Sequence, residues 1–193
     1  MQGYTIIHNT LTEKEMHDVL NLKSAKKKLI GRGATASAFA FGNDKVVRVQ
    51  KFNGEYPYAL EKYFEWVKFC KTTKSKHIPK IFYCHVEYCK SKQGWRSGRI
   101  KSITTVMERL KEWYHYTGKS SFEDQWVFDL EDACQGHNVS RHLVKMVTKH
   151  KMGTRDSLVR ICNKMERLGV NDLHSGNVMC RKDGTLVITD PVV

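Results

Sequence analysis

The sequence predicts an α+β fold in which strands fill the first half of the chain and helices most of the second. Three observations support this prediction. Runs rich in β-branched residues and bounded by turn residues fill residues 29–110. Apolar residues at helical spacing recur over residues 139–168, and a short strand–turn–strand pair follows at residues 177–189. The 193 residues, 40% of them hydrophobic, suffice for one domain or for one compact domain with two small lobes.

Two helices are predicted in the first half. One covers residues 12–22, because Thr12 can cap it and Glu15 follows at capping-box spacing. The other covers residues 57–72, where apolar residues recur at helical spacing. Strands are predicted at residues 29–41 with a glycine-rich turn inside, and at 45–52, 80–87 and 99–110.

The second half is predicted to be mostly helical. Helices are expected at residues 139–151 and 154–168, and Gly169 ends the second one at a position that favours glycine. Two short strands, at residues 177–181 and 185–189, are joined by a Lys-Asp-Gly turn.

The charge is strongly positive and unevenly distributed. Of the net charge of +13, residues 31–120 carry +11, whereas residues 121–140 carry −5. The basic excess makes nucleic-acid binding one function class to consider, and the apolar content excludes a disordered chain. No apolar run reaches the roughly 18 residues of a membrane span. Residues 1–10 lack a secretory signal and the six cysteines lack C-x-x-C spacing, so we expect a cytoplasmic protein with reduced thiols and no membrane partner.

The most informative pattern is a set of polar residues near the C-terminal end. Asn177 follows Asp172 by five residues, and Asp190 comes at the end of the next predicted strand. This pattern suits phosphoryl transfer, because one carboxylate can accept a hydroxyl proton while an amide oxygen and a second carboxylate hold magnesium. The hairpin between Asn177 and Asp190 is expected to bring them to adjacent strand ends.

The stretch D-L-H-S-G-N at residues 172–177, with I-T-D-P at 188–191, resembles the catalytic and metal-binding loops of the protein-kinase-like superfamily. It is similar to the form in aminoglycoside phosphotransferases, and more closely resembles that of the early serine/threonine protein kinases of coliphages, which help to shut down host transcription. The resemblance implies that Asp172 is the catalytic base and that Asn177 and Asp190 hold Mg²⁺. It also implies ATP as cofactor and a two-lobed fold, with an antiparallel-sheet N-terminal lobe containing one helix and an abbreviated helical C-terminal lobe.

Parts of the family's nucleotide-binding pattern are found upstream. Gly31, Gly33 and Ser37 lie in a stretch that resembles the glycine-rich loop, where backbone amides approach phosphate oxygens, although Ala36 replaces the third glycine. Arg48 stands where the family carries its phosphate-binding lysine, and arginine keeps the charge but adds a bulky fork.

The acidic partner of that lysine lies on the following helix in the family. Glu61 and Glu65 are both candidates, and spacing back from residues 77–81 favours Glu65. The alternative for both residues is a surface role, paired with neighbouring lysines.

The stretch T-T-V-M-E-R-L at residues 104–110 resembles the strand and hinge that hold adenine. By this resemblance Met107 is the gatekeeper, the backbone of Glu108 and Leu110 bonds the base, and Val46 belongs to the apolar wall.

The chain also departs from the family's pattern. Val170 and Asn171 replace the usual His-Arg before the catalytic aspartate, and the chain stops three residues after Asp190, so we expect an abbreviated kinase without an activation segment. The resemblance divides the chain into an N-terminal helical extension (1–28), a kinase-like N-terminal lobe (29–112) and a truncated C-terminal lobe with the catalytic loop (113–193).

Three functions follow as hypotheses. The first is a phage-type, ATP- and Mg²⁺-dependent serine/threonine protein kinase acting on host proteins, including acidic or transcription-related ones, and on itself. The second is a pseudokinase-like protein that binds and inhibits a host factor. The third is a basic nucleic-acid-binding protein, with lysine-rich segments at residues 23–28, 71–76 and 90–101 contacting phosphates. The sequence predicts neither the identity of the substrate nor the oligomeric state.

Overall fold

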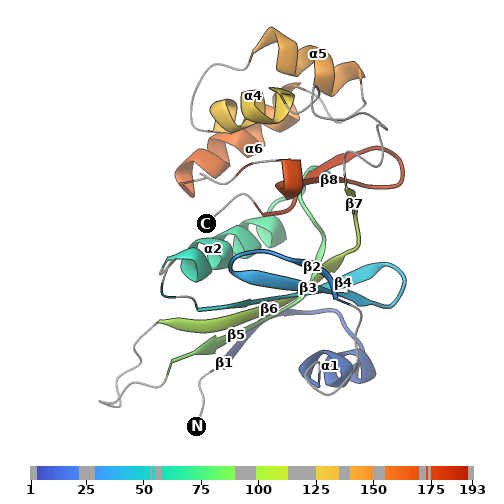
Figure 1. Ribbon diagram of the computed structural model, residues 1–193, viewed down its shortest axis with the longest axis vertical. Helices are drawn as coiled ribbons and strands as arrows, with labels where there is room; N and C mark the ends of the chain where they lie inside the picture. The colour runs from blue at the N-terminus through green and yellow to red at the C-terminus, as the bar shows by residue number, and fades with distance from the viewer. Residues whose placement is uncertain are drawn as a thin grey trace. The chain divides into compact units, whose positions relative to one another are not determined.

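A six-stranded antiparallel sheet forms the core of the first of two compact units in this computed structural model (Figure 1). The first unit consists of Met1–Val67 and Lys80–Arg109, and the second of Lys68–Pro79 and Leu110–Val193. The structure describes residues 4–21, 29–52, 54, 58–89, 99–112, 125–134, 140–149, 155–169, 173 and 175–190. The α+β class is confirmed, and so is the antiparallel N-terminal sheet expected of a kinase-like fold.

The large sheet has the strand order β1-β5-β6-β4-β3-β2, and every neighbouring pair is antiparallel. Its strands are β1 (Tyr4–Asn9), β2 (Leu29–Arg32), β3 (Ala36–Phe41), β4 (Lys45–Lys51), β5 (Ile81–Tyr88) and β6 (Ile100–Glu108). The last five lie where the sequence predicts strands, because β-branched runs and turn residues mark them locally.

Two helices lie on opposite faces of this sheet (Figure 1). Helix α1 (Glu13–Leu20) packs against a core on one face. That core consists of Leu11, Val19, Phe41, Val47, Tyr83 and Val106. Helix α2 (Ala59–Thr72) lies over the other face, where Tyr63 is fully buried. Because side chains alternate along a strand, Val47 and Arg48 point to opposite faces.

The N-terminal segment differs from the helical extension expected for residues 1–28. Helix α1 is present, but β1 precedes it and pairs with β5, so the segment adds an edge strand to the sheet. The sequence Y-T-I-I-H-N favours a strand through its aromatic and β-branched residues. The segment is short, and its pairing with β5, which is distant in the sequence, makes it a strand of the sheet.

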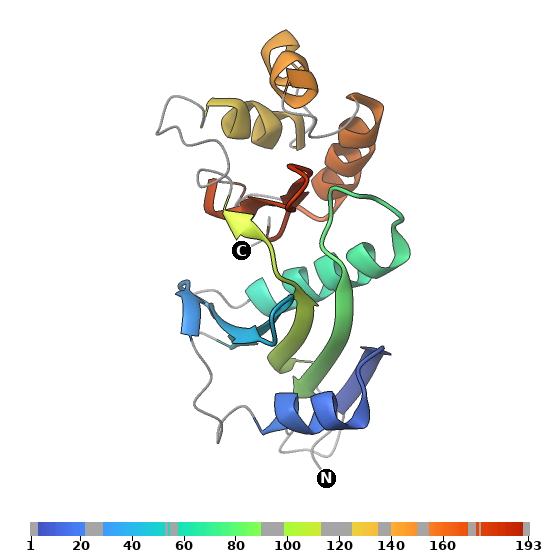
Figure 2. The ribbon, with the colours of Figure 1, turned by 90° about the vertical axis from the view of Figure 1, so that its right-hand side faces the viewer.

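In its described residues the second unit contains helices α4, α5 and α6, the end of α2 and a small antiparallel sheet, which Figure 2 shows from the side. Helix α4 (Gln125–Cys134) packs against both α5 (Arg141–Lys149) and α6 (Arg155–Arg167). The sheet has the order β7-β8-β9, formed by β7 (Lys111–Glu112), β8 (Val178–Cys180) and β9 (Leu186–Ile188), with a 3-10 turn at Ser175–Asn177. Gly169 after α6 and Gly184 in the β8–β9 turn have φ values of +66° and +84°, which favour glycine.

Helix α4 was not expected from the sequence, which shows an acidic stretch there. Leu130 and Ala133 are nevertheless buried at helical spacing, while Phe128 is 53% exposed. The acidic residues occupy positions that leave this short apolar stripe intact. None of the helices in the described part of the chain is long and apolar enough to span a membrane.

Candidate functional site

The glycine-rich turn between β2 and β3 is closed by its own backbone. The Gly33 amide donates to the Ala36 carbonyl (2.9 Å), and the Lys51 amide on β4 donates to the Thr35 carbonyl (3.3 Å). Neither Gly31 nor Gly33 has a positive φ, and a Cβ would meet its nearest atom only at 4.0 Å and 3.9 Å, respectively. The fold therefore does not require glycine at either position. The two glycines leave room beside the backbone, which suits a ligand that approaches it closely.

Strand β4 presents Val46 and Arg48 to the face of the sheet on which α2 lies. Arg48 is only 8% exposed, and its guanidinium carbon lies 3.7 Å from the centre of the Tyr63 ring. Its Nη1 donates to Oε1 of Gln50 at 2.6 Å. The charge of Arg48 is thus held in a largely desolvated position, where its interactions are stronger than in water.

Further polar contacts extend from Arg48 in both directions. Nε2 of Gln50 donates to Oγ1 of Thr35 in the glycine-rich turn (3.3 Å), and the Tyr63 hydroxyl hydrogen-bonds to Oγ1 of Thr105 on β6 (2.8 Å). Sequence reasoning missed these four residues. For Gln50 a signal existed, since it lies two residues after Arg48 and so shares its face of the strand.

Ser37 does not lie with Arg48. In the β3–β4 register Ser37 is opposite Val49, which packs against the core under α1, whereas Ala38 is opposite Arg48. Directly paired residues point to the same face, so Ser37 faces away from the Arg48 side. Ala38 is the β3 residue that shares the face of Arg48, and only the β3–β4 register identifies it.

The two glutamates of α2 lie on either side of Tyr63 along the helix. Each is two residues from Tyr63, which places it about 160° around the helix axis from that ring. Glu65 is exposed, whereas Glu61 is half-buried and its Oε2 is shielded without a hydrogen-bond partner among the described residues. From α2, the Tyr63 ring contacts the Arg48 guanidinium, and the choice between Glu61 and Glu65 as the acidic partner stays a prediction.

Two of the predicted adenine-binding residues, Val46 and Met107, lie on the same face of the sheet as Arg48. Val46 is paired with Met107, which is 7% exposed, in the β4–β6 register. The Glu108 amide donates to the Lys80 carbonyl (3.0 Å), so a base bonding to Glu108 would use its carbonyl oxygen. Leu110, which follows two residues later, is half-buried and begins the second unit.

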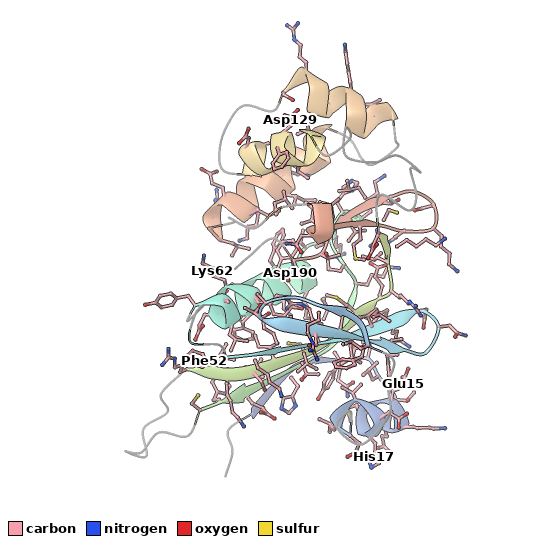
Figure 3. The ribbon with its side chains drawn as sticks, in the orientation of Figure 1. Glu15, His17, Phe52, Lys62, Asp129 and Asp190 are labelled. Atoms are coloured by element: carbon pink, nitrogen blue, oxygen red, sulfur yellow. The ribbon has the colours of Figure 1, made fainter. Side chains whose placement is uncertain are left out.

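The second unit brings Asn177 and Asp190 to one end of the β8–β9 hairpin. Val178 is paired with Ile188, and both the amide and the hydroxyl of Thr189 donate to the Asn177 carbonyl, at 2.9 Å and 3.1 Å. Asp190, labelled in Figure 3, comes next along the chain. It is half-buried, and its Oδ1 is shielded from solvent. The two predicted metal ligands thus lie at adjacent strand ends.

These two residues fit Mg²⁺. An amide oxygen and a carboxylate are hard oxygen donors, and Mg²⁺ in nucleotide sites takes one or two protein carboxylates and completes its shell with phosphate and water oxygens. Within the described ranges no three His, Cys, Asp or Glu side chains gather as metal ligands. A Mg²⁺ ion held by Asn177 and Asp190 would therefore depend on phosphate and water for its remaining ligands.

His77 supports strand β9, which ends two residues before Asp190. Its Nδ1 bonds to the Leu186 carbonyl (3.0 Å), and its own carbonyl accepts from the Ile188 amide (2.9 Å). The side chain is fully buried, and burial, reinforced by the charges of Lys76 and Arg181, lowers the pKa of His77. The imidazole is therefore neutral at pH 7, with Nδ1 carrying the proton that Leu186 accepts.

Several predictions concern residues outside those that the structure describes. Asp172 is one of them, although its neighbour Leu173 is buried. The lysine-rich segment at residues 23–28 is another, as is most of the one at 90–101. The nucleic-acid hypothesis and the assignment of the catalytic base both stay predictions.

No protein-family model matches the chain, and no curated protein matches it either. Among solved structures the chain is similar to the ternary complex of streptomycin and ATP with APH(2″)-IIa. The sequences are 14% identical, and the match covers 94% of this chain and 71% of that one, with a TM-score of 0.38.

Proposed function

We propose that the chain is a kinase-type phosphotransferase that uses ATP and Mg²⁺ to phosphorylate serine and threonine hydroxyls of proteins. The observation that carries the proposal is that Asn177, whose carbonyl accepts from Thr189, and the next residue, Asp190, lie at one end of the β8–β9 hairpin, five and eighteen residues after Asp172. A base, an amide ligand and a carboxylate ligand at these spacings are the protein's part in the chemical step of phosphoryl transfer.

Each residue then has a defined role. Asp172 accepts the proton of the attacking hydroxyl group as its oxygen bonds to the γ-phosphorus of ATP and the bond to the β–γ bridging oxygen breaks, releasing ADP. Arg48 binds phosphate oxygens, and the turn at Gly31 and Gly33 admits them close to its backbone amides. When bound, Mg²⁺ neutralises the charge on the phosphate oxygens, and Asn177 and Asp190 hold it.

The proposal of a protein substrate rests on the sequence of the predicted catalytic loop. The D-L-H-S-G-N form resembles that of coliphage early serine/threonine kinases, and on that ground we propose host proteins, transcription-related ones among them, as substrates. The net charge of +11 over residues 31–120 favours ATP and acidic protein partners through long-range attraction.

A nucleotide-binding protein without transfer activity is the second candidate. The observation that favours it is Arg48, because an arginine stacked on Tyr63 takes the place of a lysine at a tight phosphate site. Under this alternative the chain would act by binding a host factor, and ATP would bind without being consumed.

Incubation with labelled ATP, Mg²⁺ and a host lysate tests the proposal. We expect labelled protein bands with the wild type, and their disappearance with Asp190→Ala. The matched control is Asp183→Ala, which removes an aspartate from the turn of the same hairpin, where Asp183 accepts only the Thr185 amide (2.9 Å) among the bonds described. Labelling that persists in Asp190→Ala, or that neither protein gives, contradicts the proposed activity.

A further inference from the structure

A continuous series of polar contacts links the glycine-rich turn to helix α2 through Arg48. It runs from the Thr35 hydroxyl to the Gln50 amide (3.3 Å), from the Gln50 oxygen to the Arg48 guanidinium (2.6 Å), from that group to the Tyr63 ring (3.7 Å), and from the Tyr63 hydroxyl to Thr105 (2.8 Å). All five residues belong to the first unit, and Gln50, Tyr63 and Thr105 are at most 1% exposed.

The contacts fix the Arg48 guanidinium in two ways. The Tyr63 ring lies against the guanidinium carbon and restricts where the group can move, and the hydrogen bond to Gln50 holds its Nη1 in one direction. A planar fork held in this way recognises phosphate oxygens with less loss of side-chain entropy than a mobile one. A lysine could not use the ring in the same way, because its ammonium group has no plane to stack.

Gln50 uses both ends of its side-chain amide. Its oxygen accepts from Arg48, and its nitrogen donates to Thr35, which lies between Gly33 and β3 in the glycine-rich turn. A buried amide that is satisfied at both ends holds its two partners in one arrangement. The position of the turn and the position of the guanidinium are therefore coupled through one residue.

We propose that Gln50 and Tyr63 are positioning residues that hold Arg48 ready for the phosphates of ATP and that couple it, through Thr35, to the glycine-rich turn. The proposal rests on the proposed function, since it takes Arg48 to be the phosphate-binding residue. The α2 residue in this series of contacts is aromatic, since it is the Tyr63 ring that lies against the guanidinium.

Comparing the affinities for ATP and for adenosine tests the proposal on the full chain. Adenosine lacks phosphates, so a residue that positions Arg48 should affect ATP binding and leave adenosine binding unchanged, whereas general damage to the fold should weaken both. For Gln50→Met and for Thr35→Val we expect ATP affinity to fall about tenfold and about threefold, respectively, with adenosine affinity unchanged. In the double variant the loss should equal that of Gln50→Met alone, because the two residues share one hydrogen bond.

Two variants of Tyr63 separate the contribution of its ring from that of its hydroxyl group. Tyr63→Phe keeps the ring and removes only the hydroxyl, so it should retain ATP affinity within about twofold, whereas Tyr63→Leu should lower it about tenfold. Ser102→Ala serves as the control for loss of a hydroxyl on the same sheet, since Ser102 donates to Glu87 outside this series of contacts (3.0 Å). It should change neither affinity.

Failure of the positioning role and failure of the proposed function give different results in these measurements. A wild type that binds no ATP contradicts the proposed function itself. A wild type that binds ATP, together with Gln50 and Tyr63 variants that lose ATP and adenosine affinity equally or lose neither, overturns the positioning role while leaving the function standing. Selective loss of ATP affinity in Gln50→Met and Tyr63→Leu supports it.

Discussion

At the scale of single residues, the sequence predicts candidate site residues better than it predicts the side chains that they contact. The position of Arg48 and its face of the strand follow from a local pattern and from alternation. Its contact with Tyr63 depends on how helix α2 is rotated about its axis, and no local pattern near Arg48 determines that rotation. The orientation of Ser37 is not predictable from the sequence either. Its side chain faces the α1 side of the sheet, and this follows only from the β3–β4 register.

Gly33 provides a prediction that separates folding from ligand binding. A Cβ at this position would meet its nearest atom only at 3.9 Å, and φ is not positive, so Gly33→Ala should leave the free energy of unfolding unchanged or raise it by up to about 1 kcal/mol. Affinity for ATP should fall, because the methyl group fills space beside the backbone. Thermal unfolding and ATP titration measure the two effects. A variant with unaltered ATP affinity would show that phosphates do not approach this turn.

His77 gives a pH-dependent prediction. Burial lowers the pKa of His77, so the unfolded chain binds a proton below about pH 6.5 that the folded chain does not bind. Stability should therefore be highest above that pH and should fall as the pH drops below it, by at most about 1.4 kcal/mol per pH unit from this residue.

His77→Asn is the matched variant for this prediction. Asparagine can keep a donor near Nδ1 for the Leu186 carbonyl but does not titrate. Denaturant unfolding of both proteins between pH 5 and 7 should show a shallower loss of stability for the variant. The pKa of His85 is also lowered by burial, and its contribution should persist in both proteins. Parallel pH profiles would contradict this account of His77.

At the scale of elements, local signals predicted those helices and strands that have clear ends. The predicted cap of α1 is confirmed: the Glu15 amide donates to Thr12 Oγ1 (3.2 Å), and the Thr12 amide donates to Glu15 Oε2 (3.0 Å). Strand β1 and helix α4 are not predicted from the sequence, because a short strand and a helix with a narrow apolar stripe have weak local patterns. Strand β1 is held in the sheet by its pairing with β5, and helix α4 by its packing on α6.

Glu15 makes the attachment of α1 to the sheet testable. Figure 3 shows Glu15 on the side of α1 that faces the sheet, where its Oε1 lies 2.9 Å from the Lys45 ammonium group. The hydrogen bond from Lys45, followed by that from the Thr12 amide, lowers the pKa of Glu15 to about 2. Because the folded-state pKa is depressed, this stabilisation is present above about pH 4.5 and is lost as the pH falls towards 2.

Glu15→Gln keeps a capping side chain but removes the charge. Since both side chains of the ion pair are partly exposed, the variant should be less stable by about 0.5–1 kcal/mol at pH 7, and the difference should shrink below pH 4. Chemical denaturation at both pH values measures it. A difference that is the same at pH 7 and pH 3 would mean that the Lys45 ion pair does not contribute.

At the scale of the whole molecule, the predicted site residues are divided between the two units. Gly31, Gly33, Arg48 and Met107 belong to the first, and Asn177 and Asp190 to the second. The β8–β9 hairpin could be predicted because its strand and turn signals are local, whereas the role of the D-L-H-S-G-N stretch stays a prediction. The contacts that link Thr35, Gln50 and Tyr63 could not, since they join three elements whose mutual register only the folded sheet determines.

The central claim is that this chain transfers phosphate rather than only binding nucleotide, and Asp172→Asn tests it most directly. Asparagine keeps the size of the side chain but cannot accept the hydroxyl proton as a carboxylate does. The measurement compares ATP binding in the presence of Mg²⁺ with the rate of γ-phosphate transfer, for the wild type and the variant. The proposed mechanism predicts unchanged ATP affinity and a transfer rate reduced about 100-fold or more. Transfer by Asp172→Asn at the wild-type rate, or a wild type that binds ATP and transfers no phosphate, would contradict it.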